Sequence, residues 1–175
     1  LSDDGRIVGT TDTQYTSLNI DAAVSRGLEF EFRKKLPYSF TFGGNYSLIE
    51  SDVTISADRA GQLTSLERPL QGQSPELLNL QLDFEPERWQ ATFTLLYNVI
   101  GRRITGVGAD GRPDEYRESL TTLDLVASKA FKDNWKIKAQ AKNILDPEVR
   151  QTQGDKVTRV SKRGPEYSIG VSGTF

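Results

Sequence analysis

The chain has 175 residues, with 22 basic and 24 acidic side chains and a formal net charge of −2. Cysteine, histidine and methionine are absent, which excludes disulfides, thiolate or imidazole metal sites, cysteine nucleophiles and Ser-His-Asp triads. The near-neutral charge argues against nucleic-acid binding, which usually needs a basic face. No apolar run approaches the roughly 18 residues of a transmembrane helix, and no segment resembles a signal peptide.

Alternating apolar and polar residues dominate the chain and predict β-strands with two unlike faces. In one segment, for example, Phe93, Leu95 and Tyr97 alternate with Thr92 and Thr94. No segment convincingly predicts a helix. In chain order, the predicted strands cover about 14–33, 39–54, 76–86, 89–103, 117–131, 135–149 and 165–175.

The links between these strands alternate strictly between short and long. The short links, 34–38, 85–88 and 131–134, are rich in charge, proline or asparagine and suit hairpin turns. The long links are polar and contain glycine, and they cover about 52–75, 104–116 and 150–164. Transmembrane barrels have short periplasmic turns on one rim and long extracellular loops on the other. The predicted strands also exceed the usual globular length of about 5–6 residues.

Aromatic residues gather at the short-link ends of the predicted strands, where a transmembrane barrel carries an interfacial girdle. A soluble sandwich with an aromatic interior would explain neither the alternation of short and long links nor the length of the strands. We therefore predict an all-β fold, an antiparallel transmembrane β-barrel segment. The aromatic residues are Phe40, Phe84, Trp89, Phe131, Trp135 and Phe175.

Four stretches resemble the C-terminal barrel portion of TonB-dependent outer-membrane receptors. They occur in the family's order over about residues 14–175, and the last ends on an aromatic residue. Each stretch alone is a weak signal, whereas four in order are fairly specific. The stretches are NIDAAVSRGLEFE (19–31), QSPELLNL (73–80), AKNILDP (141–147) and GPEYSIGVSGTF (164–175).

This resemblance implies that residues 1–175 form the C-terminal portion of a larger barrel of about 22 strands. Seven strands are an odd number, and alone they leave two unpaired edges that lipid does not tolerate. We therefore expect the earlier strands, the N-terminal plug and the TonB box to lie outside this sequence. The resemblance also implies that the last strand is the signal for the barrel-assembly machinery, with lipid-facing Tyr167, Ile169, Val171 and Phe175.

Charged residues supply the other candidate sites. Carboxylates on the polar faces are candidates for lining the lumen, although they are also ordinary wet residues or partners of Lys136, Lys138 and Lys142. Arg102 and Arg103 lie at the outer rim and are candidates for contacting anionic substrate or lipopolysaccharide, with a solvated rim charge as the alternative. The carboxylates are Glu29, Glu31, Asp83 and Asp124.

The resemblance implies a receptor in the outer membrane of a Gram-negative cell. Such a receptor binds a scarce nutrient of the siderophore, cobalamin or oligosaccharide type and imports it with energy from the TonB complex, which acts through the plug. We expect no catalytic residue, metal or cofactor, and partners that include membrane lipid, lipopolysaccharide and the assembly machinery. The alternative is a passive porin or channel, followed by an outer-membrane enzyme or adhesin.

Overall fold

The computed structural model describes residues 22–56, 61, 63–131 and 134–173. These residues form antiparallel strands joined by turns, with one short 3₁₀ helix, η1 (Glu87–Trp89). Within those ranges, no helix reaches the length and apolarity that crossing a bilayer requires. The strands are β1 (Ala22–Leu36), β2 (Phe40–Thr54), β3 (Glu67–Arg68), β4 (Glu76–Phe84), β5 (Ala91–Ile100), β6 (Arg103–Gly106), β7 (Glu115–Arg117), β8 (Leu120–Phe131), β9 (Trp135–Lys142), β10 (Val149–Gln153), β11 (Lys156–Ser161) and β12 (Glu166–Gly173).

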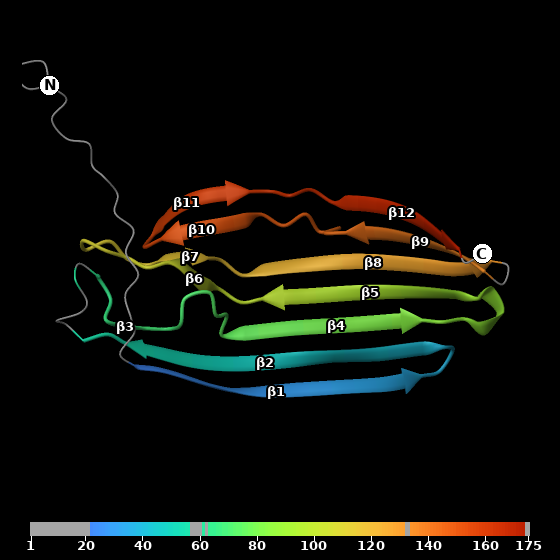
Figure 1. Cartoon of the computed structure of the whole chain (residues 1–175), viewed down its shortest axis with the longest axis horizontal. Helices are drawn as coiled ribbons and strands as arrows, with labels where there is room; N and C mark the ends of the chain where they lie inside the picture. Colours follow the sequence, from blue (N-terminus) through green and yellow to red (C-terminus); the bar gives the residue numbers. More distant parts are fainter. Residues whose placement is uncertain (1–21, 57–60, 62, 132–133, 174–175) are drawn as a thin grey trace, which may run out of the picture.

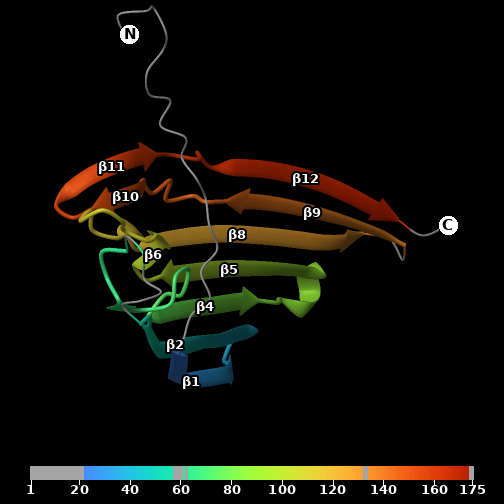
Figure 2. The same cartoon turned by 60° about the vertical axis from the view of Figure 1, so that its left-hand side comes forward.

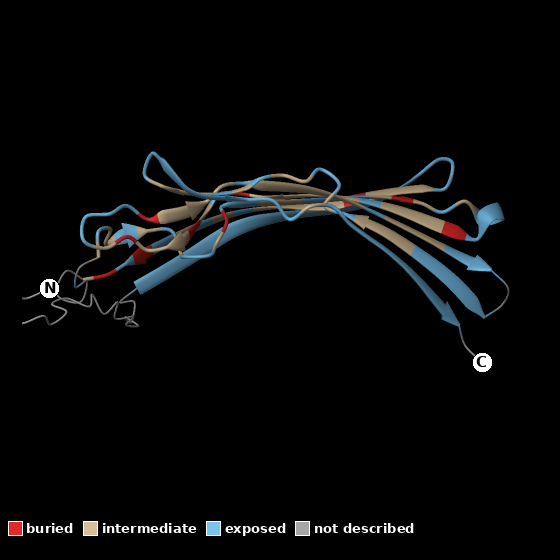
Figure 3. Cartoon of the chain, turned by 90° about the horizontal axis from the view of Figure 1, so that it is seen from above, coloured by how far each residue is buried: buried red, intermediate tan, exposed pale blue. Residues whose placement is uncertain are grey.

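The strands form one curved, open sheet and a smaller one that continues it. The large sheet has the order β1-β2-β4-β5-β8-β9-β12, with β3 paired to β2, and the small sheet has the order β11-β10-β7-β6. Consecutive long strands are neighbours throughout (Figures 1 and 2). Seen from above, the sheet arches rather than closing (Figure 3), as a segment of a barrel wall does.

All seven predicted strands are present, although several of their boundaries differ. β1 runs to Leu36, so Lys34 and Lys35 belong to the strand and not to the turn. The turn itself is tighter, because Tyr38 and Ser39 adopt positive φ angles of 61° and 65°. Residues 14–21, the predicted start of this strand, lie outside the described residues. The start of the segment predicted as 89–103 is also not a strand, because Trp89 belongs to η1.

All three links predicted as long loops contain strands, which corrects the sequence interpretation. β3 lies in 52–75, most of β6 and β7 lies in 104–116, and β10 and β11 turn most of 150–164 into a hairpin. Gly154, with a φ of 58°, supplies the turn of that hairpin. Ile100 pairs with Leu120 between β5 and β8, and Arg103 pairs with Arg117 between β6 and β7. The β6–β7 pair therefore continues the β5–β8 hairpin with no change of register between these two pairs.

The two faces of the large sheet have opposite chemistry, as the alternation predicts. One face carries large apolar side chains that nothing in the described residues covers: Ile169 is 80% exposed and Leu28 is 64% exposed. The apolar core is correspondingly small, and the buried apolar residues among those described are Val53, Ile55, Ala91 and Ile104. A soluble sandwich would bury this face, whereas a membrane barrel turns it towards lipid.

Aromatic rings stack along the apolar face at the short-turn end of the sheet. The Phe40 and Phe84 ring centroids are 4.6 Å apart, and Phe84 lies 6.1 Å from Phe93. Trp89 meets Phe93 edge-on at 6.3 Å. The same end carries the Phe131–Trp135 pair, at 6.5 Å. The contacts form two groups at the same end of the sheet, one across β2, β4 and β5 and one across β8 and β9, as expected at a membrane interface.

Candidate functional site on the polar face of the sheet

A row of polar residues crosses the face opposite the apolar one. In the strand register, Glu31 lies opposite Asn45, Asn45 opposite Asn79, Asn79 opposite Asn98, and Asn98 opposite Thr122. Directly opposed residues point to the same side of a sheet. Five neighbouring strands therefore place amide, carboxyl and hydroxyl groups side by side.

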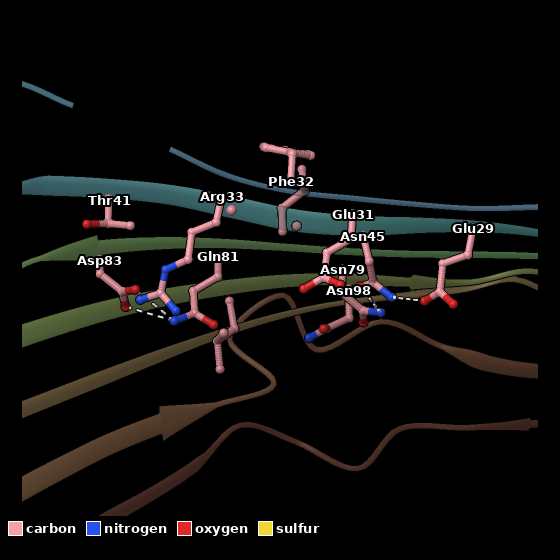
Figure 4. Close-up of a pocket in the computed structure, with 14 residues that line it drawn as sticks. Glu29, Glu31, Phe32, Arg33, Thr41, Asn45, Asn79, Gln81, Asp83 and Asn98 are labelled. Carbon is pink, nitrogen blue, oxygen red and sulfur yellow. Dashed lines mark hydrogen bonds between the residues drawn. The ribbon is translucent and has the colours of Figure 1, made fainter. Parts of the chain in front are cut away.

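Hydrogen bonds link neighbouring parts of this row and connect it to Glu29. The Asn79 side-chain amide donates to Asn45 Oδ1 at 2.9 Å, and the Asn45 amide donates to Glu29 Oε1 at 3.3 Å (Figure 4). Farther along, the Asn98 amide donates to Thr122 Oγ1 at 3.4 Å. The bonds fix the orientation of each amide while leaving other donors and acceptors for a solute.

Asp83 forms a second polar cluster nearer the short turns. Its carboxylate accepts a hydrogen bond from Thr94 Oγ1 at 2.7 Å and two contacts from Gln81 Nε2 at 2.8 and 3.0 Å. The residue is only 6% exposed. These donors compensate for the removal of the carboxylate from water.

Most of the row and of the Asp83 cluster, without Thr122 and Thr94, lines one hollow of about 320 Å³. Glu29, Glu31 and Asp83 all contribute to it, together with Arg33 (Figure 4). Gly43 makes room, because a Cβ atom there would lie 3.5 Å from Arg33 Cγ and 3.1 Å from a backbone oxygen. The hollow presents carboxylates, amides and a guanidinium, which suit hydrogen bonding to a polar solute.

The fourth predicted carboxylate, Asp124, lies apart from this hollow. It accepts a hydrogen bond from the Asn143 backbone N–H at 2.8 Å and lines a different hollow of about 490 Å³ with Lys142. No ion pair joins any of the four carboxylates to a lysine in the described part of the chain. Asp83 and Asp124 are held by neutral donors instead.

The amide residues were not predicted from the sequence, although they carry much of the hydrogen bonding. Asparagine on the polar side of a strand is ordinary, so its type alone gives no signal. Position along the strand gives no signal either, because β2 has 15 residues, β4 has 9 and β5 has 10, and Asn98 lies near the end of β5. Only the register between the strands places Asn45, Asn79 and Asn98 side by side.

The two predicted rim arginines have different neighbours in the structure. Arg102 donates through Nε to Glu118 Oε1 at 3.1 Å, and its guanidinium lies 3.8 Å from the centre of the Tyr116 ring. Arg103 belongs to β6 and lies opposite Arg117. Since neighbouring residues of a strand point to opposite faces, these two arginines serve different surroundings.

Three of the residues predicted for the assembly signal lie on β12, on its exposed apolar side. Tyr167 is 72% exposed, and Ile169 and Val171 alternate with it along the strand. The fourth, Phe175, lies outside the described residues. At the same end of β12, a Cβ atom on Gly173 would lie 2.8 Å from the Trp135 ring, so the glycine allows close approach of that ring.

Comparison with known proteins gives one match, to a protein family. The family described as TonB dependent receptor-like, beta-barrel, matches residues 2–144. Neither curated proteins nor solved structures gave a significant match. The family consists of transporters of the outer membrane that depend on TonB, and not of enzymes. The matched region spans most of the chain, from before β1 to beyond β9, and the chain belongs to the TonB-dependent receptor-like β-barrel family.

Proposed function

We propose that this chain is the C-terminal portion of the barrel of a receptor that imports a scarce nutrient. The polar hollow on the inner face carries the proposal, because it faces away from the apolar surface. A transport wall needs this combination: lipid on one side and hydrogen-bonding groups on the other. In this proposal the preceding strands and the plug come from other parts of the same receptor.

The orientation follows from the two ends of the sheet. The turn at 37–39 and the end of the sheet where β8 stops and β9 starts would face the periplasm, and the β6–β7 and β10–β11 hairpins would face the outside. Long loops on the extracellular rim and short turns on the other are the rule in these barrels. In this orientation the Asp83 cluster lies nearer the periplasm than the asparagine row.

The polar groups of the hollow suit a substrate with many hydroxyl or carbonyl groups, of the siderophore, cobalamin or oligosaccharide type. Amide and carboxylate groups such as Asn79 and Glu29 offer both donors and acceptors to such a solute. Glu31 and Asp83 would line the path for the solute, and Asp124 would line it separately, beside β9. We assign no catalytic step, metal or cofactor to these residues.

The proposal is tested by uptake in cells that carry the full-length receptor, with and without a working TonB complex. Candidate nutrients of the three classes are supplied as labelled solutes at limiting concentration. We expect uptake of one class, lost without TonB. Asn79→Leu should lower that uptake while Leu78→Val, on the adjacent lipid-facing position, leaves it unchanged at equal receptor levels. Influx that persists without TonB would identify a passive channel and overturn the proposal.

A further inference from the structure

An aliphatic side chain is buried on the polar face of the sheet, at the end with the long links. Val53 is only 1% exposed. It follows Asn45 by an even number of residues on a strand whose register with β1 is unbroken, so its side chain points to the side of the asparagine row. Ile55, the next alternate residue along the chain, is 3% exposed. Burial of apolar side chains on a face that is turned to water requires a cover from elsewhere in the chain.

The cover is the segment 63–73, which we call the ledge. It contributes three leucines that pack against Val53 and Ile55: Leu63, Leu66 and Leu70. The Ile55 N–H also donates to the Leu66 carbonyl oxygen at 3.0 Å. The ledge therefore lies on the inner side of the wall and has an apolar core beneath it.

Hydrogen bonds tie the ledge to strands on both sides of this core. The Gln73 side-chain amide donates to Ser25 Oγ of β1 at 3.1 Å, the Leu70 N–H to Ser51 Oγ of β2 at 3.0 Å, and the Gly72 N–H to the Ile104 carbonyl oxygen of β6 at 2.8 Å. In Figure 1 the green link that follows β3 passes beside β6 before it returns to β4. The ledge thus crosses the inner side of the wall from β1 to β6.

The first residues of the ledge are bound to the link between β6 and β7. Leu63 pairs with Ala109 in an antiparallel bridge, and the Thr64 N–H donates to the Gly108 carbonyl oxygen at 3.0 Å. Gly108 is itself held, because its N–H donates to Oδ1 of the buried Asp114 at 2.7 Å. The ledge is therefore anchored at both of its ends, and moving it would break these bonds and expose its apolar core to water.

The ledge lies above the polar hollow on the same strands. Ser25, which accepts the hydrogen bond from Gln73, precedes Glu29 by four residues on β1. Both residues are on one face, and four residues of a strand span about 13 Å. Since Glu29 lines the hollow, a solute that arrives from the end with the long links meets the ledge first.

We propose that the ledge is a fixed part of the entrance, which narrows the passage to the hollow and limits the size of the solute that reaches it. The inference rests on the proposed function for its orientation, because the end with the long links must face the outside. A segment that stays in place during entry selects solutes by size, whereas a movable lid admits large solutes whenever it is open.

The test measures access to the inner wall below the ledge in the full-length receptor on intact cells. Ser47→Cys places a thiol on the polar face of β2, four residues from Ser51 towards the hollow. Two probes are compared, a small maleimide and a polyethylene glycol maleimide. The large probe should react far more slowly than the small one. Adding Leu66→Ser/Leu70→Ser should raise the ratio of the large-probe rate to the small-probe rate several-fold, because these leucines hold the ledge on its core.

Two controls separate the ledge from general loosening of the receptor. Glu67→Ser/Pro69→Ser changes exposed positions of the same segment and should leave the ratio at Ser47→Cys unchanged. Glu166→Cys reports on the separate hollow beside β9, where the leucine substitutions should not alter the ratio. An unchanged ratio at Ser47→Cys after the leucine substitutions would overturn the proposal, and so would an equal rise at Glu166→Cys.

A disulfide between Leu63→Cys and Ala109→Cys tests whether the ledge stays in place, and it gives a result even if the leucine variant does not fold. Residues opposed in an antiparallel bridge have Cα atoms about 4.5–5.5 Å apart, within the range of a disulfide. The oxidised receptor should take up the labelled siderophore, cobalamin or oligosaccharide at the wild-type rate. Uptake that is lost on oxidation and restored by reduction would show that the ledge must move, and would overturn the proposal. Influx without TonB would contradict only the proposed function, because the labelling ratios do not depend on TonB.

Discussion

Asn143 and Gly164 join two links that lie 21 residues apart in the chain. The Asn143 side-chain amide donates to the Gly164 carbonyl oxygen at 2.9 Å, and the Gly164 N–H donates to Asp146 Oδ1 at 3.0 Å. Asn143 and Gly164 both have positive φ, at 55° and 77°. These two hydrogen bonds, called the interlock below, hold the link between β9 and β10 against the link between β11 and β12. They give Asn143 and Asp146 of the Asn-x-x-Asp-Pro segment a structural role.

The interlock predicts a graded response to substitution at Asn143. Asn143→Ala should cost about 2 kcal/mol of unfolding free energy, because it loses the hydrogen bond and strains the left-handed backbone. Asn143→Gly should cost about 1 kcal/mol, because glycine tolerates that backbone. Denaturant titration of the full-length receptor in lipid vesicles measures both. Equal losses would show that the backbone conformation contributes nothing.

The two faces of β4 predict opposite responses to one substitution. Leu80→Arg should destabilise the receptor by about 2–4 kcal/mol, because it places a charge near the bilayer midplane. The adjacent Gln81→Arg faces the polar side and can still donate to Asp83, so its cost should stay within about 1 kcal/mol. Refolding titration into a bilayer compares the two. If the two costs agreed, the membrane orientation of this sheet would be refuted.

We predict that the polar cluster around Asp83 contributes to the stability of the protein. Asp83→Ala removes the acceptor for Thr94 and Gln81 and should cost about 1–3 kcal/mol. Asp83→Asn keeps one oxygen for Thr94 and should cost less. The control is Glu31→Ala, at an exposed position in the same hollow, which should alter stability little. Unfolding midpoints at constant denaturant slope provide the measurement, and a neutral Asp83→Ala would mean that the cluster contributes nothing to stability.

The proposed orientation predicts which hairpin tips an antibody can reach from outside the cell. A short epitope between Gly154 and Asp155, at the β10–β11 turn, should be labelled by antibody on intact cells. The same epitope after Pro37, at the β1–β2 turn, should be labelled only after the outer membrane is permeabilised. The opposite labelling pattern would invert the proposed orientation. Receptor levels in the membrane fraction serve as the control.

We predict that deleting Phe175 affects the assembly of the receptor and not its stability. Deleting Phe175 from the full-length receptor should reduce the amount that reaches the outer membrane, because the terminal strand is proposed as the signal for the assembly machinery. Molecules that assemble should unfold at the wild-type denaturant concentration. Ser172→Ala, on the polar side of β12, is the control. Wild-type membrane levels after the deletion would disprove the assembly role.

Alternation was sufficient to predict the long strands, because lipid on one side and water on the other impose different residues on successive positions. It did not predict β3, β10, β11 or most of β6 and β7. In β10 the residues Arg150, Gln151, Thr152 and Gln153 are all polar, since neither face of the small sheet lies in the apolar band. A strand without unlike faces leaves no alternation in its sequence, and a turn residue such as Gly154 is then the main local signal.

The candidate site was predictable in part for a related reason. Glu29, Glu31 and Asp83 were assigned to polar faces correctly, since the face depends only on position along one strand. Which residues become neighbours depends on the register between strands, which turn geometry fixes. The opposition of Arg103 and Arg117 depends on the same register.

The unshifted hairpin from β5–β8 into β6–β7 has an evolutionary consequence. Any insertion of one residue between Ile100 and Arg103 would exchange the two faces of β6, turning Arg103 to the polar side and Ile104 to the apolar side. The first change of register occurs between Ile104 and Gly106. Up to that step an added residue would exchange the two faces of the strand, whereas beyond it an added residue leaves the faces of the preceding strands unchanged. Differences in chain length among relatives are therefore expected after Gly106 and not before it.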